Sequence, residues 1–73
     1  MTSLRFAVLP GSYAVARLPA GAEVPLASLV PPFSSVTRTP VELSVVCPET
    51  AAPAGARVET GWVLLGLVGP FPF

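Results

Sequence analysis

The side chains best suited to chemistry lie in one short stretch, where four hydroxyl groups occur within six residues. They belong to Ser34, Ser35, Thr37 and Thr39. Hydroxyls and neighbouring backbone N–H groups bind a carboxylate without burying a second charge. The same short side chains also form ordinary turns and caps by bonding to nearby backbone. The residues alone therefore leave two interpretations open, a small-molecule binding segment and local capping.

Catalysis is not expected from this composition. Cys47 is the single cysteine, and the chain has no histidine and no lysine, so nothing obvious activates the thiol. Glu42 and Glu49 are explained by a helix cap and a solvated loop. We predict a buried structural Cys47, no catalytic residue, no metal ligand, no cofactor and no enzymatic activity.

Length and charge limit the partners. The 73 residues allow one small domain, spanning 1–73, whose core supplies only about 3–5 kcal/mol of stability. Without disulfides or metals, oligomerisation or docking is the remaining way to stabilise it. Four arginines balance four glutamates, so no basic surface is predicted to bind nucleic acid. A hydrophobic content of 52% argues against intrinsic disorder.

Membrane insertion and secretion are both disfavoured. The last apolar run is broken by glycines and prolines well short of the roughly 20 residues that a spanning helix needs. Near the N-terminus, Arg5 precedes an apolar run and Ala14-Val15-Ala16 resembles a signal-peptidase site, but Pro10-Gly11-Ser12 interrupts that run. We expect a cytoplasmic, unprocessed chain, with secretion after cleavage near Ala16 as the alternative.

The elements that position the hydroxyls are mostly strands and turns. Residues 4–9 and 13–18 read as strands joined into a hairpin by Pro10-Gly11-Ser12. Residues 26–29 fit one helical turn, and residues 43–47 read as a strand.

A capping pattern stands before this last strand. Thr39 suits a helix cap, Pro40 the first helical position, and Glu42 the reciprocal capping residue. The pattern predicts a single helical turn that leads into the strand.

The closing apolar segment, Trp62 to Val68, is predicted to be a strand, after a loop at residues 50–61. Apolar side chains alternate to both sides of this strand, so both sides need cover that a chain of this length does not supply. Phe71 and Phe73 follow and are expected to be buried by further protein.

Most of the chain resembles a known family. The matching segments are Pro10-Gly11-x-Tyr13-Ala14-Val15-x-Arg17-Leu18, then Phe33-x-Ser35-Val36-Thr37-Arg38-Thr39-Pro40-x-Glu42-Leu43-Ser44-Val45-Val46-Cys47-Pro48-Glu49, then Gly61-Trp62 and Gly69-Pro70. They are similar to the N-terminal half of small bacterial tandem ACT-domain proteins, which are related to the arginine sensors called CASTOR and to the regulatory part of aspartate kinase.

This resemblance implies an α+β fold, with a small, mostly antiparallel β-sheet and short helical turns. That fold is half of a tandem ACT-like, ferredoxin-like architecture, since family members are about twice as long. It implies a non-catalytic regulatory module that binds an amino-acid effector where two ACT units meet, with Ser35, Val36, Thr37 and Thr39 as the candidate ligand-binding residues. The expected partners are the effector and either a second copy or another ACT unit. The alternative is a structural fragment that pairs with itself or with a separate C-terminal half and binds no ligand.

Overall fold

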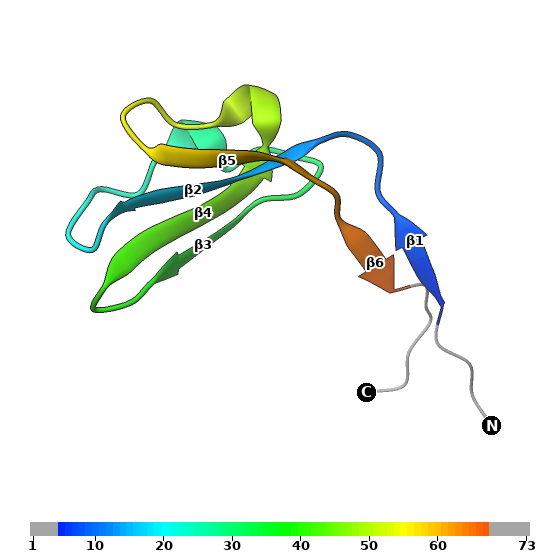
Figure 1. Ribbon diagram of the computed structural model, residues 1–73, viewed down its shortest axis with the longest axis horizontal. Coiled ribbons are helices and arrows are strands. Elements are labelled where there is room, and N and C mark those ends of the chain that lie inside the picture. Colours follow the sequence, from blue (N-terminus) through cyan, green and yellow to red (C-terminus); the bar gives the residue numbers. More distant parts are fainter. Residues whose placement is uncertain (1–4, 68–73) are drawn as a thin grey trace.

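The computed structural model describes residues 5–67 as two antiparallel sheets (Figure 1). In chain order the elements are β1 (Phe6–Val8), β2 (Tyr13–Pro19), η1 (Leu26–Ser28), β3 (Ser35–Arg38), β4 (Glu42–Pro48), η2 (Glu49–Ala51), β5 (Arg57–Trp62) and β6 (Leu65–Leu67). The mostly antiparallel sheet is confirmed. The α component of the expected α+β class is wrong for residues 5–67, where the helical elements are the short 3-10 turns η1 and η2.

The larger sheet has four strands in the order β3-β4-β2-β5. Its core follows the two-residue period of β4, where Leu43, Val45 and Cys47 are buried and the residues between them are half-buried. Ala14 and Ala16 of β2 lie opposite Cys47 and Val45 and are also fully buried. The strands predicted at residues 13–18 and 43–47 are thus confirmed.

The connection between β2 and β3 covers this face, which we call the covered face. Leu29, just after η1, packs with Leu18 and Ala56 against Ala16, Val45 and Cys47. The η1 turn lies within the helical turn predicted at residues 26–29. Small alanines on β2 let this thin connection approach the sheet closely. The opposite face, which we call the open face, carries Tyr13, which is buried and contacts Phe33, and the more accessible Val15, Arg17, Ser44 and Val46.

The turn between β3 and β4 corrects one prediction. Residues 39–41 close a β-hairpin, and no helical turn forms there. The backbone N–H of Thr39 donates to the carbonyl oxygen of Glu42 at 2.8 Å, which is hairpin geometry. The capping pattern was misleading because a Thr hydroxyl holds the free N–H groups of a tight turn just as it holds those of a helix start.

The first predicted hairpin is also wrong. β1 pairs with β6 in the register Phe6↔Leu67, Ala7↔Gly66 and Val8↔Leu65, while β2 pairs with β4 and β5. Gly11, with φ of +97°, lies where the chain passes from one sheet to the other. β1 and β6 form a two-stranded arm that projects away from the larger sheet (Figure 1).

The closing segment is divided between the two sheets. β5 ends at Trp62 and β6 begins at Leu65, so the single strand predicted from Trp62 to Val68 is wrong. The loop predicted at residues 50–61 is wrong as well, since it contains most of β5. β5 is an exposed edge strand whose single apolar residue before Gly61 is Val58. Its sequence therefore lacks the alternation of apolar and polar residues that predicts a strand. Val68, Phe71 and Phe73 lie outside the described residues.

Candidate functional site

The predicted binding residues fall on different sides of the sheet. Ser35 and Thr37 lie opposite Val46 and Ser44, which places both hydroxyl residues on the open face. Val36 lies opposite Val45 and therefore belongs to the covered face. Along β3, an exposed edge strand, Ser35 and Thr37 are thus brought together and Val36 is separated from them.

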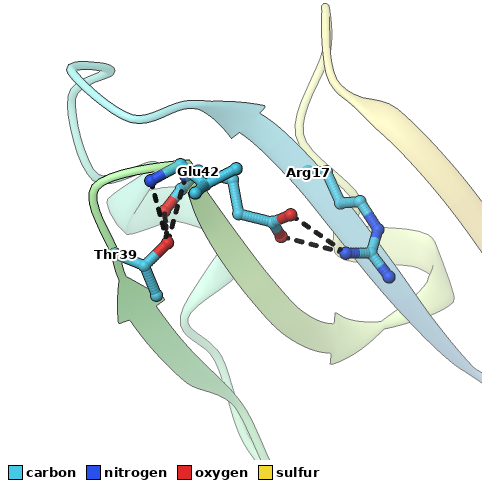
Figure 2. A network of polar contacts seen from close by, with 4 residues as sticks. Arg17, Thr39 and Glu42 are labelled. Atoms are coloured by element: carbon cyan, nitrogen blue, oxygen red, sulfur yellow. Dashed lines mark hydrogen bonds and ion pairs between the residues drawn. The ribbon is translucent and has the colours of Figure 1, made fainter.

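Thr39 stands in the β3–β4 turn and its hydroxyl is occupied there. The Thr39 Oγ1 accepts the N–H of Val41 at 3.2 Å and that of Glu42 at 3.1 Å, and it donates to the Glu42 carbonyl oxygen at 3.3 Å (Figure 2). Three local hydrogen bonds make this side chain a turn-forming residue. It positions the ends of β3 and β4.

A row of polar side chains crosses the open face. Strand register aligns Thr37 of β3 with Ser44 of β4, Ser44 with Arg17 of β2, and Arg17 with Arg57 of β5. We call these four residues the polar row. Directly opposite residues on neighbouring strands have Cβ atoms about 4.5–5.5 Å apart, so the row presents two hydroxyls beside two guanidinium groups. Arg17 and Arg57 are like charges on adjacent strands, and the Glu42 carboxylate offsets the charge of Arg17.

Two carboxylates border the polar row. Glu42 lies next to it on β4, and its carboxylate accepts two bonds from Nη1 of Arg17, at 3.0 Å and 3.2 Å (Figure 2). Glu59 follows Arg57 by two residues on β5 and lies opposite Val15, on the open face. Because the Arg17 and Glu42 side chains are 45% and 29% exposed, their ion pair is screened by water and contributes about 1 kcal/mol or less.

Arg38, by contrast, is used structurally. Its guanidinium donates to the carbonyl oxygen of Ala20 and, at 2.9 Å, to that of Ala22. These bonds hold the beginning of the β2–β3 connection against the end of β3.

A second polar cluster joins the two sheets. The Glu49 carboxylate accepts bonds from the Ser12 hydroxyl and, at 3.0 Å, from the backbone N–H of Gly61. The Ser12 bond first, and the Gly61 bond second, hold the pKa of Glu49 below its usual value. Ser12 precedes β2 and Gly61 lies near the end of β5, so this carboxylate ties both passages between the sheets.

Cys47 lies in the core of the larger sheet. It is a free thiol with no exposed surface, and burial raises its pKa, which disfavours the reactive thiolate. The prediction that it is buried is confirmed. In residues 5–67 no three His, Cys, Asp or Glu side chains gather as a metal site, and no helix there is long and apolar enough to span a membrane.

The described residues enclose no pocket, so the open face offers a ligand one wall. A small molecule on a single wall keeps much of its surface in water, whereas ligand sites usually bury most of the ligand. The geometry is suited to orienting a charged ligand and needs a second surface to enclose it.

Comparison with known proteins adds the family. A family model described as the N-terminal domain of a group of related proteins matches residues 11–55, more than half of the chain. The chain belongs to this family of N-terminal domains. The matched region contains β2, β3 and β4, and with them every predicted binding residue and most of the polar row.

A solved structure also matches the chain as an N-terminal domain. This N-terminal domain is similar to the crystal structure of protein Atu0741 from Agobacterium tumefaciens, with 38% sequence identity and a TM-score of 0.88. The similarity covers 100% of this chain and 55% of that chain, so the domain spans about half the length of the solved relative. No curated protein matches the chain.

Of the polar row, the sequence predicts only Thr37 as a binding residue. Arg17 is typical of a solvated surface arginine, and Ser44 and Arg57 carry no signal of their own. Arg57 lies in the segment predicted to be a loop, and its alignment with Arg17 depends on β5 pairing with β2. The signal that would have found the row is the shared face of Thr37, Ser44 and Arg17, which requires knowing the strand order.

Proposed function

We propose that this domain is a non-catalytic regulatory module of ACT type, which binds an amino-acid effector between its open face and a second unit. The observation that supports this proposal best is the polar row, Thr37, Ser44, Arg17 and Arg57, on the open face of the four-stranded sheet. The family membership supports the module being part of longer proteins. Ser35 and Thr37 are the predicted binding residues that this geometry favours.

The polar row, together with the neighbouring Glu59, fits both ends of an α-amino acid. Guanidinium groups at Arg17 and Arg57 match a carboxylate, and the hydroxyls of Thr37 and Ser44 add neutral donors beside it. Glu59 is available on the same face for an ammonium group. Because Arg17 already binds Glu42, an effector carboxylate would bind Arg57 and share Arg17 with Glu42.

A second unit is part of this proposal because one wall does not enclose a ligand. Another ACT-type unit or a second copy of the chain would supply the opposite wall and exclude water from the charged contacts. Charge-assisted bonds strengthen when water is removed, which would make effector binding and assembly mutually supportive. We propose a cytoplasmic setting with no nucleic-acid or membrane partner.

Thermal unfolding with each of the twenty amino acids, arginine included, tests effector binding. The screen is run on the chain alone and on the chain fused to the following half of Atu0741. An effector at ten times its Kd stabilises by about 1.4 kcal/mol, which raises the Tm of a small domain by several degrees. Thr37→Val is expected to remove most of this rise, while Thr50→Val, at an exposed position on η2, leaves it unchanged. If no amino acid raises the Tm in either form, effector binding is wrong.

The alternative, a structural module that pairs without a ligand, is favoured by one observation. Large apolar side chains are exposed on the arm, away from the polar row. If this alternative holds, the assembled state forms without any amino acid and Ser35→Ala leaves assembly intact. Sedimentation velocity with and without the best amino acid of the thermal screen distinguishes the two proposals.

A further inference from the structure

One side of the arm is an exposed apolar surface. Phe6 and Val8 of β1 alternate with Ala7, and Val8 pairs with Leu65 of β6. Leu9 donates its N–H to the Leu64 carbonyl oxygen at 2.9 Å, which continues the ladder and places Val63 on the same side as Leu65. Phe6, Val8, Val63 and Leu65 are 61%, 65%, 61% and 62% exposed. We call these four residues the arm face.

The arm face is more than scattered surface hydrophobicity. Four large side chains, each more than half exposed and adjacent along a single ladder, present on the order of 400 Å² of apolar surface, the size at which patches are often functional. The other side of the arm carries Ala7 and Gly66, with Leu9 packed near Gly66. A ribbon of two strands is only marginally stable by itself in water. The arm therefore gains most from a partner that covers the arm face.

The occupant is indicated by the longer relative. The matched half of Atu0741 is followed by almost as much chain again. In this domain the described residues end in β6, at the end of the arm farthest from the four-stranded sheet (Figure 1). A polypeptide continuing from that point would begin next to the arm face, where tethering raises its effective concentration far above that of a free partner.

We propose that the arm face is the docking surface for a second domain of the kind that follows the matched half of Atu0741. This inference deepens the proposed function, because it identifies where the second unit attaches. The arm face binds that domain through apolar contacts, and the open face remains directed toward the effector. Docking and ligand binding thus use different residues of the same module.

Hydrogen–deuterium exchange, read by mass spectrometry, tests the docking surface. Exchange in β1 and β6 is compared between the chain alone and the chain fused to the following half of Atu0741. The fusion is expected to slow exchange there by about tenfold or more, because a covered ladder opens less often. Val8→Glu is expected to return the rates to those of the free chain. Val41→Glu is the matched control, since Val41 is 81% exposed in the β3–β4 turn, away from the arm.

Each outcome decides the proposal. It is overturned if fusion leaves exchange in β1 and β6 unchanged, or if Val8→Glu keeps the protection. It is also overturned if the free chain is a dimer whose arm is already protected, which would make a second copy the occupant. Slow exchange in β4 of every variant shows that the larger sheet is folded. The amino-acid thermal screen is run on the same fusion. If the arm is not protected from exchange but an amino acid still raises the Tm, docking is refuted and effector binding is not. If the arm is protected but no amino acid raises the Tm, effector binding is refuted and docking is not.

Discussion

The left-handed backbone conformation of Gly61, where the chain passes from β5 towards the arm, can be tested by measuring the stability of an alanine variant. Its φ is +81°, in the left-handed region, where an L residue costs about 1–2 kcal/mol relative to right-handed backbone. A Cβ added at Gly61 meets no atom within 4 Å, so backbone conformation is the cause of the cost, and the N–H that donates to Glu49 is retained. Alanine recovers about 0.4–1 kcal/mol by restricting the unfolded chain. Gly61→Ala is therefore expected to destabilise the domain by about 1 kcal/mol.

Gly21 is the matched control. It also has no atom within 4 Å of an added Cβ, but its φ is not positive. Gly21→Ala should stabilise the domain by about 0.4–1 kcal/mol through the same effect on the unfolded chain. With a urea m-value of about 1 kcal/mol/M, the unfolding midpoints of the two variants should differ by about 1.5–2 M. Equal midpoints, followed by circular dichroism, would refute the left-handed conformation at Gly61.

Three further predictions concern single side chains. Thr39→Ala should cost about 1 kcal/mol in urea unfolding because two turn N–H groups lose their acceptor, whereas Thr39→Ser should cost little; equal losses would contradict the hydroxyl's role. Because folding lowers the pKa of Glu49, its ionised carboxylate stabilises the folded domain above the usual pKa of 4.5, and this stabilisation is lost as pH falls through the lower pKa of the folded state. Glu49→Gln should therefore make the free energy of unfolding fall less steeply at acid pH. An unchanged fall would argue against this account. The buried Tyr13 hydroxyl has no hydrogen-bond partner within residues 5–67, so Tyr13→Phe should leave the free energy of unfolding unchanged or raise it by up to about 1 kcal/mol. A clear fall in the free energy of unfolding would indicate a hydrogen-bonded hydroxyl.

The local sequence pattern predicts the strands that have one buried face. It does not predict the strands whose position depends on pairing with distant segments. The period of two in β4 is visible in the sequence because Leu43, Val45 and Cys47 alternate with partly exposed residues. β5 has no such contrast, because it is an edge strand whose residues are all exposed. The β1–β6 pairing joins residues far apart in the chain, and no local signal separates it from the nearer β1–β2 hairpin.

The candidate site shows the same division. Ser35 and Thr37 were found from their residue types, and the strand alternation that separates Val36 from them follows once β3 is known. The sequence predicts that the Thr39 hydroxyl accepts a backbone N–H, and it does accept the N–H of Glu42. The bond closes a β-hairpin, however, and does not begin a helix. Glu42 was expected to complete a helix cap, and it pairs with Arg17 because β2 lies beside β4. Side-chain partners across strands depend on topology, which composition and spacing do not contain.

The central claim, that the open face receives an amino acid against a second unit, is tested most directly by NMR. The labelled chain, fused to the following half of Atu0741, is titrated with the amino acid that raises its Tm most. The account predicts that the largest backbone shifts occur at Thr37, Ser44, Arg17 and Arg57. Largest shifts on β1 and β6, at the buried residues of the covered face, or nowhere in the domain would contradict it.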